Sequence, residues 1–153
     1  MYSLCALIGT TNALNMEIPV YSSARTVRLD GGVSMIPLGE ALLAEISESG
    51  GLGAGPSIAG AFEFLGAGVE AWVRVLSAGG PTAYVETEYF GGEGFERSAV
   101  WSAGKLALGP HDAAGSINQA LRALGVRSPT DNQEFELVGL NRFRSVEEWL
   151  AHS

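Results

Sequence analysis

Cysteine and histidine, on which most metal sites and many nucleophilic sites depend, are nearly absent from this chain of 153 residues. The one cysteine, Cys5, cannot form an internal disulfide, and its apolar neighbours predict a buried thiol with no evident base beside it. The two histidines, His111 and His152, form no His-x-x-x-His pair and lie beside no cysteine cluster. The sequence therefore predicts neither a metal site nor any other cofactor.

Basic residues are also scarce. Nine lysine and arginine residues stand against 17 acidic ones, which gives a net charge of −8, and Lys105 is the one lysine. Binding to a phosphate backbone needs clustered basic side chains, so we expect no nucleic-acid partner. An acidic surface keeps a protein in solution, and it also speeds the encounter with a basic protein. The charge alone favours the first of these two interpretations.

Long apolar runs are missing as well. No run reaches the ~20 residues that a membrane-spanning helix needs. The first nine residues lack the basic leader of a secretory signal, and we interpret them as a first strand that is apolar on both faces. We therefore expect a cytoplasmic protein that does not bind a membrane. The length and the hydrophobic content of 46% predict a single domain, 1–153, with a buried core.

The segment 49–57 reads Ser-Gly-Gly-Leu-Gly-Ala-Gly-Pro-Ser and is the clearest internal break. Its Gly-x-Gly-x-Gly string raises the alternative of a phosphate-binding loop. A dinucleotide fingerprint needs a preceding strand and a spaced third glycine at a helix start, whereas here Pro56 intervenes and the preceding element is predicted as a helix. We interpret the segment as a flexible linker and expect Ser57 to cap the next helix.

Hydrophobic periodicity predicts an α+β fold with a mainly antiparallel sheet and helices packed on one face. Asp30-Gly31-Gly32 predicts a hairpin turn, and Ser116 and Ser145 each open a helical capping box. The predicted strands are 2–9, 24–30, 33–38, a three-stranded meander over 81–108, and 133–140. The predicted helices are 38–47, 58–78, one beginning at residue 116 and one at 145, and Gly66 and Gly68 weaken the middle of the longest of them.

The stretch from Pro81 to Trp101 is predicted to be the central β-hairpin, because two β-rich runs flank Gly-Gly-Glu-Gly. Side chains alternate between the faces of a strand, so Thr87 and Tyr89 lie on the face that we expect to meet the core. The opposite face would present two carboxylates about 7 Å apart beside an aromatic ring. From that face and the glycine-rich turn we predict partner contacts by Tyr84, Glu86, Glu88, Gly91, Gly92, Glu93 and Gly94.

The pair Glu86 and Glu88 allows three interpretations. It could be a solvated or ion-paired strand face, with Arg97 opposite, or an acidic recognition patch, or an acid and base pair as in glycoside hydrolysis. The Glu-x-Glu pattern also resembles the catalytic pair of ADP-ribosyltransferases, whose early arginine and Ser-Thr-Ser strand have no match here. No Gly-x-Ser-x-Gly elbow occurs either. We expect no catalytic residues, and we expect glutamine at both positions to leave stability nearly unchanged.

Several pieces of the C-terminal half resemble a family of small uncharacterised bacterial proteins that look like immunity proteins of toxin systems. These pieces are Glu86-x-Glu88-Tyr-Phe-Gly-Gly-x-Gly94, Ala99-Val-Trp101, Ile117-Asn-x-Ala-Leu121-x-x-Leu-Gly-Val126 and Glu148-Trp149. The resemblance implies an inhibitor that binds a cognate toxin, occludes its active site and carries no catalytic residues of its own. The partner would be a basic protein. A small enzyme using Glu86 and Glu88, and a structural or assembly subunit, remain as alternatives.

Overall fold

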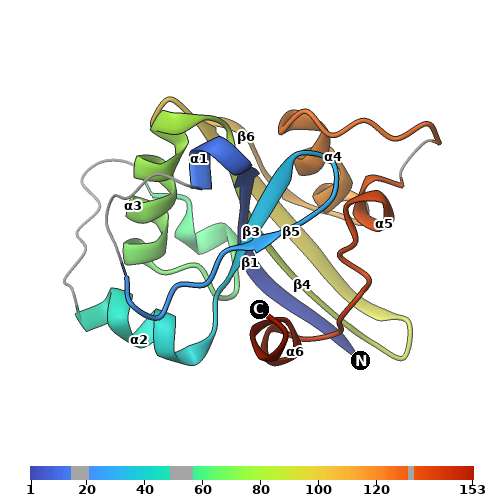
Figure 1. Cartoon of the computed structure of the whole chain (residues 1–153), viewed down its shortest axis with the longest axis horizontal. Coiled ribbons are helices and arrows are strands. Elements are labelled where there is room, and N and C mark those ends of the chain that lie inside the picture. The colour runs from blue at the N-terminus through green and yellow to red at the C-terminus, as the bar shows by residue number, and fades with distance from the viewer. Residues whose placement is uncertain (15–20, 49–56, 131–132) are drawn as a thin grey trace.

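The centre of the fold is a six-stranded antiparallel sheet in the order β2-β3-β1-β4-β5-β6 (Figure 1). The computed structural model describes residues 1–14, 21–48, 57–130 and 133–153. The strands are β1 (Tyr2–Thr10), β2 (Val27–Arg28), β3 (Val33–Pro37), β4 (Thr82–Phe90), β5 (Glu93–Ser102) and β6 (Lys105–Asp112). The helices are α1 (Thr11–Leu14), α2 (Glu40–Glu48), α3 (Ala67–Leu76), α4 (Ser116–Ala123), α5 (Glu134–Val138) and α6 (Val146–Ala151), with short 3-10 turns η1 (Ala59–Ala61) and η2 (Ser77–Gly79).

The predicted α+β class and the mainly antiparallel sheet are confirmed, but the expectation of helices on one face is wrong. Helices α2 and α3 cover one face of the sheet, and α4, α5 and α6 cover the other (Figure 1). The cause is that the central strands are apolar on both sides, as the sequence of β1 already indicates. Leu7 of β1 points to the first face, whereas Leu4 and Ile8 point to the second.

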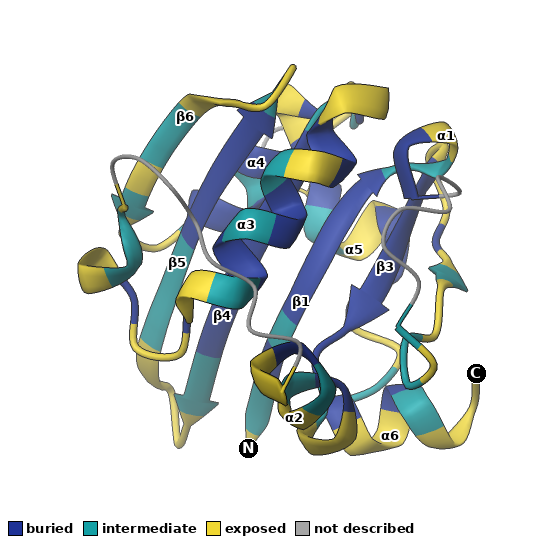
Figure 2. Cartoon of the chain, turned by 90° about the vertical axis from the view of Figure 1, so that its left-hand side faces the viewer, coloured by how far each residue is buried: buried dark blue, intermediate teal, exposed yellow. Residues whose placement is uncertain are grey.

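Each face of the sheet therefore has its own apolar cluster. On the α3 side, Trp101 packs with Leu7 and Tyr84 of the sheet and with helix residues such as Trp72. On the α4 side, Val85 and the rest of that face pack with helix residues that include Ile117, Leu121, Val138 and Trp149. The central strands β1 and β4 are mostly buried, and the exposed residues of β4 and β5 lie at the hairpin end (Figure 2).

Two glycines close the central hairpin in the way that the sequence predicts. Phe90 pairs with Glu93, so Gly91 and Gly92 form a two-residue loop, with φ values of 61° and 84°. Positive φ at both positions is the geometry that suits the twist of an antiparallel hairpin and that glycine adopts without strain. Gly94 is required for another reason, because a side chain there would collide with the backbone of Glu88.

Two predicted elements differ from those in the structure. The helix predicted over 58–78 is divided into η1 and α3, because Gly66 has an extended backbone (φ −96°, ψ 163°) and stands at the start of α3. The strand predicted over 133–140 is instead the helix α5, which ends at Gly139 with φ 92°. Alternation of Phe135 and Leu137 suggested the strand, but in the structure Val138 is buried and Leu137 is 39% exposed. Helical spacing explains that burial.

The helix starts agree with the sequence in part. Ser145 caps α6, since its hydroxyl oxygen accepts a hydrogen bond from the Glu148 amide at 3.2 Å, as the capping box predicts. At α4 the residue before the helix is Gly115, and no side chain at that position caps it.

The predicted linker 49–57 lies outside the described residues except for Ser57, whose side-chain oxygen accepts a hydrogen bond from the Ala59 amide at 3.2 Å. None of the helices in the described ranges is both long and apolar enough to cross a membrane.

Replacement of Trp101 by alanine should test the core on the α3 side. This side chain is fully buried in β5. We expect Trp101→Ala to lower the free energy of unfolding by about 3–5 kcal/mol, since a large buried ring is lost and a cavity remains. Urea denaturation measures the change. Phe90→Ala is the matched control, because Phe90 is 74% exposed and its loss should change stability by less than about 0.5 kcal/mol. Equal losses for the two variants would contradict the assignment of the core.

Candidate functional site

The hairpin face that was predicted to contact a partner is buried near the middle of the sheet. Tyr84 and Glu86 are both 0% exposed. The ring of Phe62 packs edge-to-face on Tyr84 with centroids 5.2 Å apart, and the Cys5 sulfur lies 3.3 Å from the Tyr84 hydroxyl. Segment 57–66 and α3 cover this face, which the sequence did not reveal. Tyr84 and Glu86 are therefore not surface contact residues, and that part of the prediction is wrong.

Glu86 anchors the backbone of the segment that covers it. Its two carboxylate oxygens accept hydrogen bonds from the amides of Glu63 at 2.7 Å and Phe64 at 3.0 Å. Burial raises the pKa of Glu86, while these two amides and the charge of Arg97 act in the opposite direction. Arg97 stands opposite Glu86 in the sheet, but its ion pairs are with Asp112 at 3.1 Å and Glu63 at 3.9 Å. The interpretation of Glu86 as a solvated side chain is thus wrong.

A second buried glutamate, Glu70, holds the same segment at two residues that lie six positions before Glu63 and Phe64. The Glu70 carboxylate accepts hydrogen bonds from the Ser57 hydroxyl at 2.6 Å and the Ile58 amide at 2.9 Å. Arg74 lies one turn further along α3 and pairs with Glu70 at 3.4 Å, as its spacing predicts. Glu70 and Glu86 therefore fix both ends of segment 57–64 against the rest of the protein.

Neither a thiolate nor a metal cluster adds chemistry to this face. Burial raises the pKa of Cys5 to about 11, so the thiol is protonated at neutral pH. Across the described ranges, no three His, Cys, Asp or Glu side chains come together in a way that could hold a metal ion.

The end of the hairpin is the part of the predicted contact surface that is exposed. Gly91, Gly92, Glu93 and Gly94 are exposed, and Glu88 is partly exposed. Phe90, which was not among the predicted contacts, is 74% exposed directly before the turn. A large apolar side chain is thus exposed at the hairpin end, and its position next to the glycines was the available signal in the sequence.

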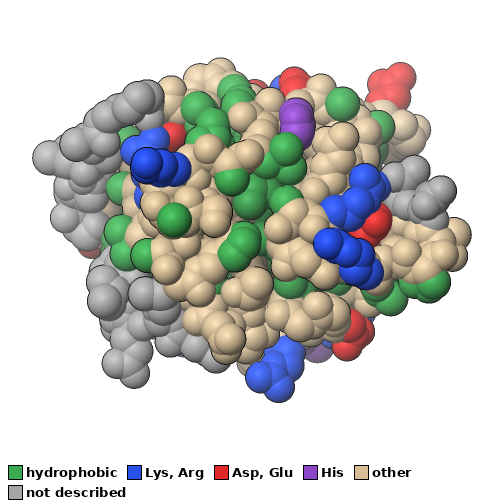
Figure 3. Space-filling model, turned by 90° about the horizontal axis from the view of Figure 1, so that it is seen from above, with side chains coloured by type: hydrophobic (Ala, Val, Ile, Leu, Met, Phe, Trp, Pro, Cys, Tyr) green, Lys and Arg blue, Asp and Glu red, His purple; other side chains and the backbone are tan. Residues whose placement is uncertain are grey.

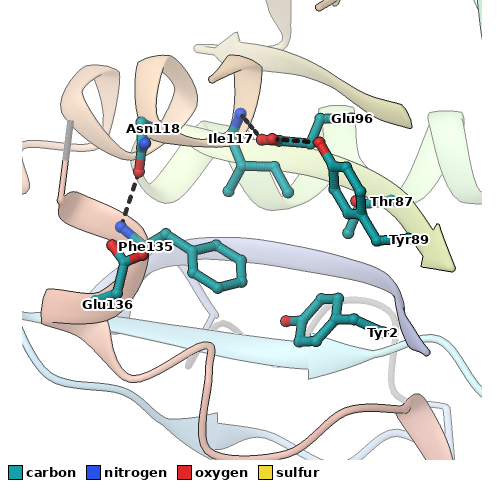
Figure 4. A pocket seen from close by; sticks show the side chains of 8 residues that line it. All are labelled: Tyr2, Thr87, Tyr89, Glu96, Ile117, Asn118, Phe135 and Glu136. Atoms are coloured by element: carbon teal, nitrogen blue, oxygen red, sulfur yellow. Dashed lines mark hydrogen bonds between the residues drawn. The ribbon is translucent and has the colours of Figure 1, made fainter. Parts of the chain in front are cut away.

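The opposite face of the same hairpin end lines a cavity with a volume of about 270 Å³. It opens between the sheet and the helices α4 and α5, and Figure 4 shows the side chains around it. The prediction that this face meets the core is correct for Ala83, Val85 and Thr87, which are buried, whereas Tyr89 is only partly buried. The cavity itself was missed because of the strand predicted at 133–140, since it is the helix α5 that places an aromatic ring and a carboxylate here. The lining residues are Tyr2, Thr87, Tyr89, Glu96, Ile117, Asn118, Phe135 and Glu136.

Glu96 organises the polar wall of this cavity. Its carboxylate accepts the Tyr89 hydroxyl at 2.8 Å and the amides of Gly115 at 3.3 Å and Ile117 at 3.4 Å (Figure 4). The carboxylate thereby caps α4 from the neighbouring strand, and a negative charge is stabilising at that end of a helix. Burial and the contact with Glu96 raise the pKa of Tyr89 to about 12, so this phenol is a proton donor at neutral pH.

Two further hydroxyl groups of the cavity are hydrogen-bonded to the backbone. Tyr2 donates to the Leu140 carbonyl at 2.8 Å, and Thr87 donates to the Phe95 carbonyl at 2.7 Å. The side-chain oxygen of Asn118 accepts from the Phe135 amide at 2.8 Å and so fixes the start of α5 against α4. The Tyr2 and Phe135 rings meet edge-on, with centroids 5.6 Å apart.

Comparison of the chain with protein-family models, with curated protein sequences and with solved structures found no match.

The role of Glu86 as an anchor predicts that Glu86→Gln destabilises the fold. A glutamine has one acceptor oxygen, so at least one of the Glu63 and Phe64 amides would lose its partner and meet an amide NH₂ group instead. We expect a loss of about 1–3 kcal/mol, measured by urea denaturation. Glu88→Gln, two residues along the same strand face and partly exposed, is the control and should be nearly neutral. Equal stability of the two variants would instead support the expectation from the sequence that neither Glu86 nor Glu88 is needed for folding.

The raised pKa of Glu86 predicts a pH dependence. A folded-state pKa above the ordinary value of 4.5 means that the folded protein binds this proton more tightly than the unfolded chain. This contribution to stability is fully present below pH 4.5 and is lost as the pH rises through the folded-state pKa. The difference in unfolding free energy between wild type and Glu86→Gln should therefore widen as the pH falls from neutral. A difference that narrows would show that the folded state favours the charged carboxylate.

Proposed function

We propose that the protein binds another protein through the end of the β4–β5 hairpin, and that it acts as an immunity protein which neutralises a cognate bacterial toxin by occluding its active site. The observation that carries the proposal is the exposure of Phe90 at 74% on a hairpin closed by Gly91 and Gly92. Aromatic side chains bury a large apolar area on binding, and they are enriched at protein interfaces. The hairpin end lies at the lower edge of the molecule (Figure 1).

The charge around the hairpin end supports a basic partner. Glu88 and Glu93 flank the turn, and the whole chain carries a net charge of −8. Complementary charge acts mainly on the rate of association, and an acidic surface suits the basic cleft of an enzyme that acts on a phosphate-rich substrate. On the far side of the molecule, seen in Figure 3, Lys and Arg side chains lie in separate groups instead of the single stripe that favours nucleic acid.

The alternative of an enzyme that uses Glu86 and Glu88 has less support from the geometry. Both oxygens of Glu86 are engaged by backbone amides, and the side chain is inaccessible to a substrate. A pair of catalytic carboxylates needs both groups to reach one scissile bond. The alternative of an assembly subunit also uses a protein contact, and it differs in that the partner would carry no activity for this protein to inhibit.

Identification of a partner and its dependence on the hairpin end test the proposal. The tagged protein is used to capture partners from the native host, and a candidate is then purified and its activity measured with and without this protein. We expect Phe90→Ala to weaken binding by ten-fold or more and to reduce inhibition in proportion. We expect Glu93→Lys to slow association, with an effect that shrinks as salt rises. Surface plasmon resonance measures both.

The control is Glu147→Lys, which makes the same charge change at an exposed position of α6. It should leave the association rate close to that of the wild type. If Phe90→Ala and Glu147→Lys bind the partner equally well, the hairpin end is not the contact surface. If the captured protein has no activity that this protein reduces, the assembly alternative replaces the immunity role.

A further inference from the structure

The hydroxyl groups that line the cavity beside the hairpin end offer a ligand hydrogen-bond acceptors and no donors. A hydroxyl group has one proton to donate, and those of Tyr2, Tyr89 and Thr87 are all donated within the protein. What these three oxygens can still present is their lone pairs. A ligand that satisfies them must bring its own N–H or O–H groups.

The charge of the cavity selects the same kind of ligand. Glu96 lies in its wall and Glu136 is exposed at its rim, and none of its eight lining residues is Lys, Arg or His. A carboxylate or phosphate ligand would be repelled by both glutamates and would find no basic partner. A cation is attracted by both, and a partly buried charge pair is screened less by salt than an exposed one.

Aromatic rings complete the wall. Figure 4 shows the rings of Tyr2, Tyr89 and Phe135 around the same space. The face of an aromatic ring attracts a cation, and a planar guanidinium can also stack on it. Acceptor oxygens, carboxylates and ring faces together are the environment that a guanidinium group requires, with its five N–H donors and no acceptor.

We propose that this cavity binds one alkylguanidinium group, and that in the complex this group is an arginine side chain of the basic partner. The volume of 270 Å³ is below the ~300 Å³ at which pockets for whole small molecules begin, and it suits a single side chain. Tyr89, in the cavity wall, and Phe90, at the exposed tip, are consecutive residues of β4 and point to opposite faces of the hairpin. A partner that surrounds the hairpin end, and so contacts both faces, would cover Phe90 and fill the cavity. The cavity's preference for a cation follows from its lining residues alone. The assignment of that cation to an arginine of the partner rests on the proposed function.

The experiment uses the purified protein with two probes and needs no toxin. One probe is n-butylguanidinium, and the other is the capped peptide acetyl-Gly-Arg-Gly-amide. Each has a neutral counterpart of nearly the same shape, n-butylurea and the citrulline peptide. Binding is followed by the shifts of the Ile117 and Phe135 backbone amides in two-dimensional NMR at low salt. We expect saturable shifts with both cations, and binding at least ten-fold weaker for both neutral counterparts.

Variants show whether the cation occupies the cavity. We expect Glu136→Gln, at the exposed rim, and Phe135→Leu, which removes a ring, each to weaken the binding of both cations by about two- to five-fold. Glu147→Gln on α6 makes the same charge change away from the cavity and should have no effect. The Ile117 amide reports directly, because it is bonded to Glu96 in the wall.

Three outcomes would overturn the inference. Equal affinity for butylurea and butylguanidinium would show that the positive charge of the ligand does not contribute to binding. Equal weakening by Glu136→Gln and Glu147→Gln would place the cation elsewhere on the acidic surface. Binding of butylguanidinium without binding of the arginine peptide would assign the cavity to a free small cation and overturn the partner side chain. None of these outcomes depends on Phe90, so each leaves the proposed protein contact at the hairpin end to its own test.

Discussion

Much of the α3 side depends on the carboxylate of Glu86. Residues 63–66 lie between η1 and α3, outside regular secondary structure, and their amides need acceptors when they are covered. Glu86 supplies two acceptor oxygens from the middle of β4, and this places Phe62 and Leu65 in the same apolar cluster as Tyr84. Burial of a carboxylate is unfavourable unless its oxygens are bonded, so the anchor and the segment need each other.

The sequence predicted the sheet well because strand periodicity is a local property. The central hairpin, its Gly91-Gly92 turn and the division of β4 into two sets of side chains all follow from the residues of that stretch alone. The packing partners of each set of side chains, in contrast, come from distant parts of the sequence. Glu86 was expected in solvent on account of its charge, and only the distant amides of Glu63 and Phe64 make its burial possible. Likewise, the cavity could not be predicted without α5, whose five residues carry too short a pattern to separate helix from strand.

The exposed tip belongs to β4 and β5, and the cavity combines residues of these two strands with residues of β1, α4 and α5. Phe90 offers apolar area on one side of the hairpin end, while Glu96 and its neighbours offer acceptors on the other. Glu96 has two roles, because it also caps α4 through the amides of Gly115 and Ile117. The wall of the cavity is thus tied to the framework of the fold, and it is formed before any ligand arrives. Such preorganisation lowers the entropy that binding must overcome.

The alternation of side chains along β4 also bears on how this protein can evolve. Tyr84 and Glu86 belong to the packed interior on one face, whereas Thr87 and Tyr89 open into the cavity on the other. Substitution of the interior side chains is therefore expected to affect folding, whereas substitution at the hairpin end should mainly affect the proposed contact with a partner. A lineage facing a changed partner could alter Tyr89 or Phe90 while Glu86 stays fixed. Under the proposed function, the hairpin end would change its binding specificity with little loss of stability.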